Sequence, residues 1–314
     1  MSLKYLVLGI ATYLPWFDKI RASRAHTGGT DSARYCYSVW LRHLVNAYQK
    51  GVCTSYPNAV AELGPGDSIG IGLCALISGA DVYYGLDVVK YANVDRNLEI
   101  FEALVELFRR KENIPDDQEF PKLKPLLDSY DFPSEILPDC HLEKCLNDNR
   151  IKEIRESIIA ADRKDSKIKY VAPFHDKNVI KQESLDMLYS QAVLEHVENL
   201  HEIYDNMKHW LKPSGFISHQ IDFKCHGLAR EWNGHWTYSD LKWKLIKGRR
   251  PYLLNRQSLS QHMKFICQHF KVIGEVKITV GETRIQPKDL APSFKHMSKA
   301  DLSTSAAFFQ AVKK

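Results

Sequence analysis

Two acidic residues enclose a glycine turn in the most regular part of the chain. Glu62 ends a short apolar run, Gly64 and Gly66 follow it, and Asp87 closes a second apolar run. Glycines let the backbone approach a ligand closely, and an acid about 20 residues after such a turn can accept hydrogen bonds from ribose hydroxyls. The additional acid Asp67 disfavours a phosphate at this turn. The pattern therefore predicts a site for a ligand that carries both positive charge and a ribose.

Histidines and an acid near the ends of two later apolar runs could accept a proton. His196 follows the predicted strand 185–190, Asp222 lies at the end of the predicted strand 216–223, and His226 comes just after it. Ligands of parallel α/β sheets bind at the carboxyl ends of the strands, where a positioned histidine or carboxylate can act as a general base. The sequence predicts that the base is one of these three residues and leaves the choice open.

The order of the predicted elements is typical of an α/β fold. A strand, the glycine turn, a helix and a strand form a nucleotide-binding βαβ unit over residues 60–87. Further strands are predicted at 168–174, 185–190, 216–223, 271–280 and 303–312, and helices at 32–50, 97–110, 141–162, 198–211 and 260–270. Crossover connections predict a mostly parallel sheet, and its last two strands are expected to pair as a terminal antiparallel hairpin.

Two blocks of motifs resemble class I S-adenosylmethionine-dependent methyltransferases. The stretches ELGPGDSIG and GLD resemble the first two motifs of that superfamily, and LEHV with LKPSGF resembles the fourth and fifth. S-adenosylmethionine has the sulfonium, ammonium and ribose that the glycine turn favours. The resemblance implies a Rossmann-like methyltransferase fold with this cofactor. The positions that match the cofactor-binding motifs are Glu62, Gly64, Gly66, Ser68, Asp87, Asp176 and Gln191. It also implies that Asp176 meets the adenine and that Gln191 lies near the transferred methyl group.

The chain divides into an N-terminal part, residues 1–56, and a methyltransferase domain, residues 57–314. The first part is expected to supply an arm and a helix that cover the cofactor. The domain carries a helical insertion after its second strand, at about 95–165, and an insertion after its fifth strand, at about 224–260. The second insertion is rich in aromatic residues and histidine. Aromatic rings pack against sugars, and forked donors bind hydroxyls or carboxylates. The candidate acceptor-binding residues in it are Trp232, His235, Trp236 and Arg256.

A wider set of motifs is similar to bacterial methyltransferases encoded with genes for surface polysaccharides, the O-antigen or the capsule. The motifs are RYCYSVWLRHL, ELGPGDSIG, QAVLEHVENL, SHQIDF, WNGHW and LNRQSLSQH. This similarity implies a sugar acceptor in a nucleotide-linked or lipid-linked glycan and an enzyme in the cytoplasm, but it does not identify the methylated atom. Our leading hypothesis is O-methylation of that sugar.

Composition excludes some partners. The formal net charge is +5, but no block of five or six like charges indicates a nucleic-acid-binding tail. The seven cysteines include no CxxC pair, as expected for reduced thiols. The spacing of Asp222, His226 and His235 matches no metal site, and no metal is predicted. The apolar run 5–17 is too short to span a bilayer, so it is expected to pack on the protein or to contact a membrane surface peripherally.

Two other functions remain open from the sequence. An NAD-dependent sugar-modifying enzyme would also use a βαβ unit, although Gly70 comes one residue late for the GxGxxG turn and no TyrxxxLys pair lies near the site. A methyltransferase-like module that binds cofactor or glycan without catalysis would share the same motifs.

Overall fold

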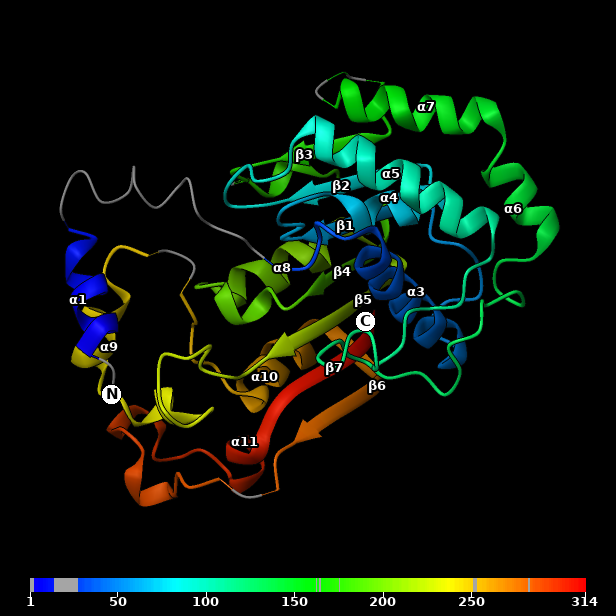
Figure 1. Cartoon of the computed structure of the whole chain (residues 1–314). Coiled ribbons are helices and arrows are strands. Elements are labelled where there is room, and N and C mark those ends of the chain that lie inside the picture. Colours follow the sequence, from blue (N-terminus) through cyan, green and yellow to red (C-terminus); the bar gives the residue numbers. More distant parts are fainter. Residues whose placement is uncertain are drawn as a thin grey trace.

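In the part of the chain that the computed structural model describes, the strands form one sheet of seven (Figure 1). The structure describes residues 3–13, 28–161, 163, 165–174, 176–250, 253–281 and 283–314. The strands lie in the order β3-β2-β1-β4-β5-β7-β6, and β7 runs antiparallel to both of its neighbours. They are β1 (Ala59–Leu63), β2 (Val82–Leu86), β3 (Ile168–Val171), β4 (Leu185–Gln191), β5 (Leu211–Asp222), β6 (Phe270–Thr279) and β7 (Thr304–Lys313). The predicted α/β class, a mostly parallel sheet with a terminal antiparallel hairpin, is confirmed.

Helices cover both faces of this sheet. On one face lie α3 (Ala33–Gln49), α4 (Gly70–Ile77) and α5 (Val94–Arg109), and on the other lie α8 (Leu200–Trp210) and α10 (Leu259–His269). Side chains alternate between the two cores, as the period of a strand requires: Val60 points toward the first helices, and its neighbours Ala59 and Ala61 point toward the second. Because both faces are covered, the central strands are almost continuously apolar.

The insertion after β2 is attached to α3. Beyond α5 it contains a long loop, α6 (Asp139–Cys145) and α7 (Asp148–Ile159). The Ser38 hydroxyl donates to the Pro115 carbonyl at 2.7 Å, and the Arg42 guanidinium donates to the carbonyls of Pro115 and Pro125 at 3.0 and 2.8 Å. Arg42 is fully buried by these contacts. The loop of this insertion therefore belongs to the main core.

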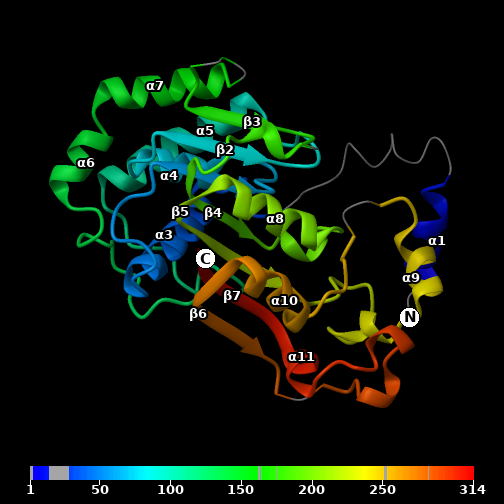
Figure 2. The same ribbon diagram turned by 180° about the vertical axis from the view of Figure 1, so that it is seen from behind.

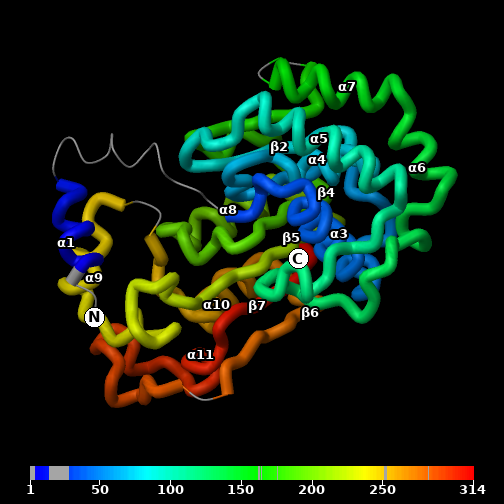
Figure 3. Tube along the Cα trace, viewed as in Figure 1, coloured from blue at the N-terminus to red at the C-terminus, as the bar shows by residue number. Residues whose placement is uncertain are grey.

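The insertion after β5 packs against the N-terminus of the chain. It contains the short helix η3 (Gly234–Thr237) and α9 (Asp240–Lys247), and α1 (Leu3–Ala11) lies beside α9. Figure 2 shows this pair from behind, and Figure 3 shows it at the opposite end of the molecule from α6 and α7. Residues 14–17 of the predicted arm, and the rest of 14–27, lie outside the described residues. In the described part of the chain, no helix has the length and apolarity needed to cross a bilayer.

The remaining short helices connect these elements. They are η1 (Lys177–Val179), η2 (Leu194–His196), η4 (Pro287–Asp289), η5 (Pro292–Phe294) and α11 (Lys299–Ser303).

Candidate active site

The glycine turn follows β1 and lies against the residues that follow β4. Gly64 and Gly66 have φ values of +64° and +75°, a region that L side chains rarely adopt. A Cβ on Gly64 would lie 2.7 Å from a methyl carbon of Val193, the second residue after β4. The two glycines thus allow the turn to bend and to approach the next strand end.

Asp87 closes β2 beside this turn. Its carboxylate accepts hydrogen bonds from the Gly66 amide at 3.2 Å and from the Val88 amide at 2.7 Å. Burial raises the pKa of the Asp87 carboxyl, and these two amides act in the opposite direction. The acid that the sequence predicts for the ribose therefore lies at the same strand edge as the glycine turn.

Glu62 is buried in the layer between the sheet and the helices. Its Oε2 accepts hydrogen bonds from the Tyr83 hydroxyl at 2.6 Å and from the Tyr189 hydroxyl at 2.9 Å. Burial raises the pKa of Glu62 to about 8, although the two hydroxyls lower it. Gly72 leaves room for the Tyr83 ring, since a Cβ there would lie 2.1 Å from a ring carbon. Glu62 can therefore change its protonation near neutral pH when a cation binds nearby.

Ser68 fastens the glycine turn to the segment before α3. Its amide donates to the Thr30 hydroxyl at 3.3 Å, and its own hydroxyl donates to the Thr30 carbonyl. Ser68 is fully buried. Its contact with the cofactor stays a prediction, and in this structure it holds the N-terminal part of the chain over the turn.

A cleft of about 460 Å³ opens at this edge of the sheet. Its walls are mostly apolar and come from β1, β2, the turn after β4 and the start of α8; they include Leu63, Val88, Phe174, Val193 and Ile203, with Asp87 among them. Apolar walls beside a carboxylate fit an adenosine, whose ribose hydroxyls can donate to the acid. Glu62 is not among the lining residues, because its side chain bonds Tyr83 and Tyr189 on the other face of the sheet; its contact with the cofactor stays a prediction.

Asp176, which is predicted to meet the adenine, lies at the start of η1. Its Oδ1 accepts a hydrogen bond from the Asn178 amide at 2.8 Å and caps η1. Phe174, two residues earlier, lines the cleft, whereas Asp176 is not among the lining residues. A contact between Asp176 and the adenine stays a prediction.

The Gln191 side chain is held by α3 and by the loop after α5. Its Oε1 lies 3.1 Å from His43 Nε2, and its amide donates to the Lys124 carbonyl at 3.4 Å. His43 Nδ1 lies 2.7 Å from the hydroxyl of Ser218 on β5. Burial lowers the pKa of His43 to about 4, so the ring is neutral at pH 7. His43, within the motif RYCYSVWLRHL, was not predicted as a site residue, because its contact with Gln191 spans 148 positions.

The three candidates for the base lie close together. His226 Nε2 is 3.5 Å from Asp222 Oδ2, and the rings of His226 and His196 have centroids 5.5 Å apart. His196 also lines the cleft that contains Asp87. This histidine therefore lies between the cleft and the His226–Asp222 pair.

The environment of Asp222 favours its ionised form. Burial acts to raise the pKa of this carboxyl, but His226, the Lys224 amide and the Lys224 ammonium outweigh burial, and the pKa is lowered. The amide donates to Asp222 Oδ1 at 2.9 Å, and the ammonium lies 3.5 Å from it. A carboxylate beside an imidazole orients the ring and stabilises its protonated form.

Glu195, next to His196, was missed by the sequence analysis. It is almost fully buried, and its carboxyl oxygens have no hydrogen-bond partner among the described residues. Burial raises its pKa well above the usual value, and the Asp222 carboxylate adds to this effect. The Asn255 side chain donates to the carbonyls of Leu194 and Val197 at 2.7 and 2.8 Å, which holds the turn containing Glu195 and His196 in place.

The four residues predicted to bind the acceptor pack together within the insertion after β5. The Trp236 indole is fully buried and donates to the Arg256 carbonyl at 2.8 Å, and the half-buried Trp232 packs on Trp236. His235 is buried, and its pKa is lowered to about 3 by burial and by the charges of Arg256 and His226. Direct contact of these side chains with an acceptor stays a prediction.

Arg256 has its guanidinium engaged inside the protein. It donates to the Tyr238 carbonyl at 2.7 Å and to Asp240 Oδ1 at 2.9 Å, and it lies over the Trp243 and Phe294 rings at 4.8 and 4.7 Å. These contacts support the fold of the insertion.

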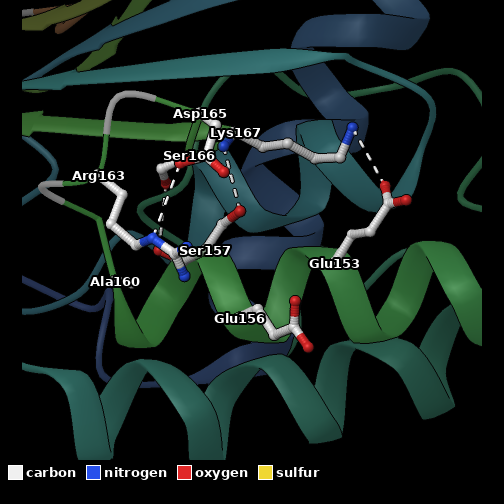
Figure 4. A pocket seen from close by; sticks show the side chains of 8 residues that line it. All are labelled: Glu153, Glu156, Ser157, Ala160, Arg163, Asp165, Ser166 and Lys167. Carbon is white, nitrogen blue, oxygen red and sulfur yellow. Dashed lines mark hydrogen bonds and ion pairs between the residues drawn. The ribbon is translucent and has the colours of Figure 1, made fainter.

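A second hollow, of about 280 Å³, lies between α7 and the start of β3 (Figure 4). Lys167 Nζ lies 3.4 Å from Glu153, and the Lys167 amide donates to the Ser157 hydroxyl at 3.1 Å. The hollow is at the amino end of β3, away from the edge that carries Asp87. Its acids and bases largely neutralise one another, and we assign it no role in the chemistry.

Metal ligation is not indicated by the geometry. Within the ranges that the structure describes, no three or more His, Cys, Asp or Glu side chains are arranged to hold a metal ion.

Comparison with known proteins gives one match in sequence. Residues 151–218 match the model of a methyltransferase domain. They run from α7 through β3, β4 and α8 into β5, and so contain the LEHV turn and Gln191. The chain therefore contains a methyltransferase domain. A search of curated proteins found no significant match.

Solved structures that resemble this methyltransferase are distant. Phosphoethanolamine N-methyltransferase 2 of Haemonchus contortus, in complex with S-adenosyl-L-methionine, has 13% identity and a TM-score of 0.41; the match covers 98% of this chain and 60% of that one. An S-adenosylmethionine-dependent methyltransferase of Mesorhizobium loti has 13% identity and a TM-score of 0.41, with coverage of 85% and 96%. Geranyl diphosphate methyltransferase has 10% identity and a TM-score of 0.43, with coverage of 88% and 85%. Similarities this weak carry no argument about the acceptor.

Proposed function

We propose that this methyltransferase transfers a methyl group to a hydroxyl of a sugar in a surface glycan or its nucleotide-linked or lipid-linked precursor, at the inner face of the cytoplasmic membrane. The observation that carries the proposal is the position of His196 between the cofactor cleft and the His226–Asp222 pair. A hydroxyl acceptor needs a base next to the methyl donor, whereas the cleft alone would serve any acceptor.

The residues of the cleft would hold the cofactor. Asp87 would accept hydrogen bonds from the ribose, Val88 and Val193 would flank the adenine, and Glu62 would offset the positive charge. Bound there, S-adenosylmethionine supplies an electrophilic methyl carbon on its sulfonium. Most of the catalytic benefit would come from holding the acceptor in line at contact distance.

His226 is the residue that we assign as the base. Its Nε2 faces the Asp222 carboxylate and would carry the proton of the neutral ring. Its Nδ1 would then carry no proton and could accept one from the acceptor hydroxyl. Asp222 then stabilises the imidazolium that forms. His196, in contact with both sides, would orient the acceptor between the base and the cleft.

The residues around the His226–Asp222 pair favour a sugar over other hydroxyl acceptors. The insertion that carries Trp232 and Trp236 begins directly after β5, and Lys224 places an exposed ammonium beside Asp222 that could bind a phosphate or a uronate. The resemblance to surface-polysaccharide methyltransferases points to the same acceptor class.

The test is a methyl-transfer assay with radiolabelled S-adenosylmethionine and a panel of nucleotide sugars and lipid-linked glycans. His226→Asn should lower kcat by about a hundredfold or more, with the affinity for S-adenosylhomocysteine unchanged. The matched control is His201→Asn, because His201 also pairs with an aspartate four residues away, 3.0 Å from Asp205 on the surface. Full activity of His226→Asn would exclude this base. Cofactor binding without methylation of any glycan would favour the non-catalytic alternative.

A further inference from the structure

The helices α1 and α9 form a tightly packed pair (Figures 1 and 2). Gly9 lies so close to α9 that a Cβ on it would be 2.0 Å from the Leu245 carbonyl oxygen. The Thr12 hydroxyl accepts a hydrogen bond from the Arg249 amide at 2.8 Å. The inner side of the pair is a small core in which Trp243 and Ile246 of α9 pack with Tyr5 and Leu6 of α1.

The outer side of the same pair exposes large apolar side chains. Val7, Ile10 and Tyr13 on α1 and the turn after it are 57%, 50% and 47% exposed, and Leu241 and Leu245 on α9 are 71% and 39% exposed. The spacing of three residues on α1 and of four on α9 places each set on one face of its helix. Because the inner core is already filled, a second apolar face on two adjacent helices indicates an interaction surface.

The charges on the two helices are mostly positive. The exposed cations Lys4, Lys244 and Arg249 lie on the two helices and the turn after α9. The acid within residues 3–13 and 240–250 is Asp240, which is bound by Arg256 at 2.9 Å. A second copy of this chain would bring cations against cations, so the charge favours an anionic partner. An apolar face flanked by lysine and arginine is the pattern of a helix that lies in the interface of an anionic bilayer.

The surface is also close to the proposed base. The Tyr5 hydroxyl approaches Gly227, where a Cβ would lie 3.4 Å from it, and Gly227 follows His226 in the chain. On α9, Lys247 pairs at 2.6 Å with Glu198, which lines the cofactor cleft. A lipid bilayer against the outer face would therefore lie a single helical layer from the active site.

We propose that the outer face of α1 and α9, formed by Val7, Ile10, Tyr13, Leu241 and Leu245 with the cations Lys4, Lys244 and Arg249, docks on an anionic lipid bilayer. Docking itself does not depend on the proposed sugar acceptor. If both hold, the membrane presents the headgroup of a lipid-linked acceptor to His226, and the enzyme collects this acceptor from a two-dimensional surface.

The test is sedimentation of the full-length protein with vesicles of phosphatidylcholine alone and of phosphatidylcholine with phosphatidylglycerol. The protein should sediment with the anionic vesicles, and this binding should weaken as salt is raised. Val7→Asp with Leu241→Asp should lower the partition by about tenfold or more, because two charges would enter the interface. The matched control is Ile273→Asp with Val276→Asp, which alters two similarly exposed apolar side chains on β6 and should leave binding unchanged.

A second variant separates docking from misfolding. Lys244→Glu changes only a surface charge and should weaken binding to anionic vesicles by about tenfold, with unchanged affinity for S-adenosylhomocysteine. Failure of the wild-type protein to bind anionic vesicles would overturn the proposal. So would loss of binding in the β6 control, or a dimer in light scattering that Leu241→Asp dissociates, which would make a second copy the occupant. Glycan methylation is not part of this readout, so the two proposals can fail separately.

Discussion

At the scale of single residues, the acid before the glycine turn has the most informative environment. Glu62 is buried against Tyr83 and Tyr189, and its pKa of about 8 means that it is largely protonated at neutral pH when no cation is near. If S-adenosylmethionine binds with its positive charge near this side chain, as the sequence motif predicts, that charge stabilises the carboxylate form. Binding of S-adenosylmethionine should therefore expel a proton from this side chain.

We expect the affinity for S-adenosylmethionine to rise with pH up to about pH 8, by at most about tenfold per pH unit. Below pH 8 the protonated acid must ionise at a cost before it can balance the ligand's charge. Calorimetry in two buffers of different ionisation enthalpy measures the released proton directly. Glu62→Gln should abolish the release, and Tyr189→Phe, which removes one hydrogen bond to the carboxylate, should shift it to higher pH. Equal proton release from Glu62→Gln would show that another group titrates.

At the scale of elements, the insertion after β5 helps to build the site. Asn255 lies in the segment between α9 and α10, yet it bonds three backbone groups of the turn after β4: its amide donates to the Glu195 carbonyl at 2.7 Å, and its side chain to those of Leu194 and Val197. The insertion thereby positions His196.

Asn255→Ala should lower both activity and stability. Loss of two side-chain hydrogen bonds to buried carbonyls is expected to cost about 1–3 kcal/mol of unfolding free energy, and a mobile His196 should reduce kcat more than it raises the KM for S-adenosylmethionine. Steady-state kinetics and urea unfolding check both effects. The control is Gln257→Ala, two residues away, whose side chain makes no hydrogen bond with the described part of the chain. A variant that loses stability but keeps its kcat would show that the position of His196 does not depend on the Asn255 hydrogen bonds.

The sequence predicted individual helices and strands better than the contacts between them. Apolar runs bounded by glycine or proline placed all seven strands and the helices α3, α5, α8 and α10 to within a few residues, because these signals are local. Contacts between distant parts have no local signal. Three such contacts join segments that lie more than 50 positions apart in the chain: the packing of α1 on α9, the His43–Gln191 contact and the Asn255 hydrogen bonds to the turn after β4. The predicted proton acceptors came together because the carboxyl ends of parallel strands share an edge. Glu195 was missed because nothing in LEHV distinguishes a buried acid from an exposed one.

At the scale of the whole molecule, buried histidines and acids set opposite limits on stability. Burial lowers the pKa values of His43, His235 and His262 to about 4, 3 and 3, and that of His219 well below its usual value. Unfolded histidines titrate near pH 6.5. As the pH falls below 6.5, the unfolded state therefore binds protons that the folded state does not, and stability is lost.

The buried acids act in the opposite direction. Burial raises the pKa of Glu62 to about 8 and that of Glu195 well above normal. As the pH rises from about 4.5 to 8, the unfolded state releases protons that these acids keep when folded, so stability falls with rising pH.

The free energy of unfolding should consequently pass through a maximum near pH 6.5. Below that pH the four histidines outnumber the acids, and above it only the acids contribute to the slope; each unbalanced proton is worth about 1.4 kcal/mol per pH unit. Urea unfolding across this range measures the curve. His262→Gln can keep a hydrogen bond to Tyr204 and should reduce the acid slope by one proton, whereas His296→Gln, at an exposed position, should leave it unchanged. Glu62→Gln should reduce the alkaline slope in the same way. Stability that stayed flat from about pH 5 to about pH 8 would mean that these side chains are hydrated in the folded protein, and the neutral His43 that holds Gln191 would then lose its physical basis.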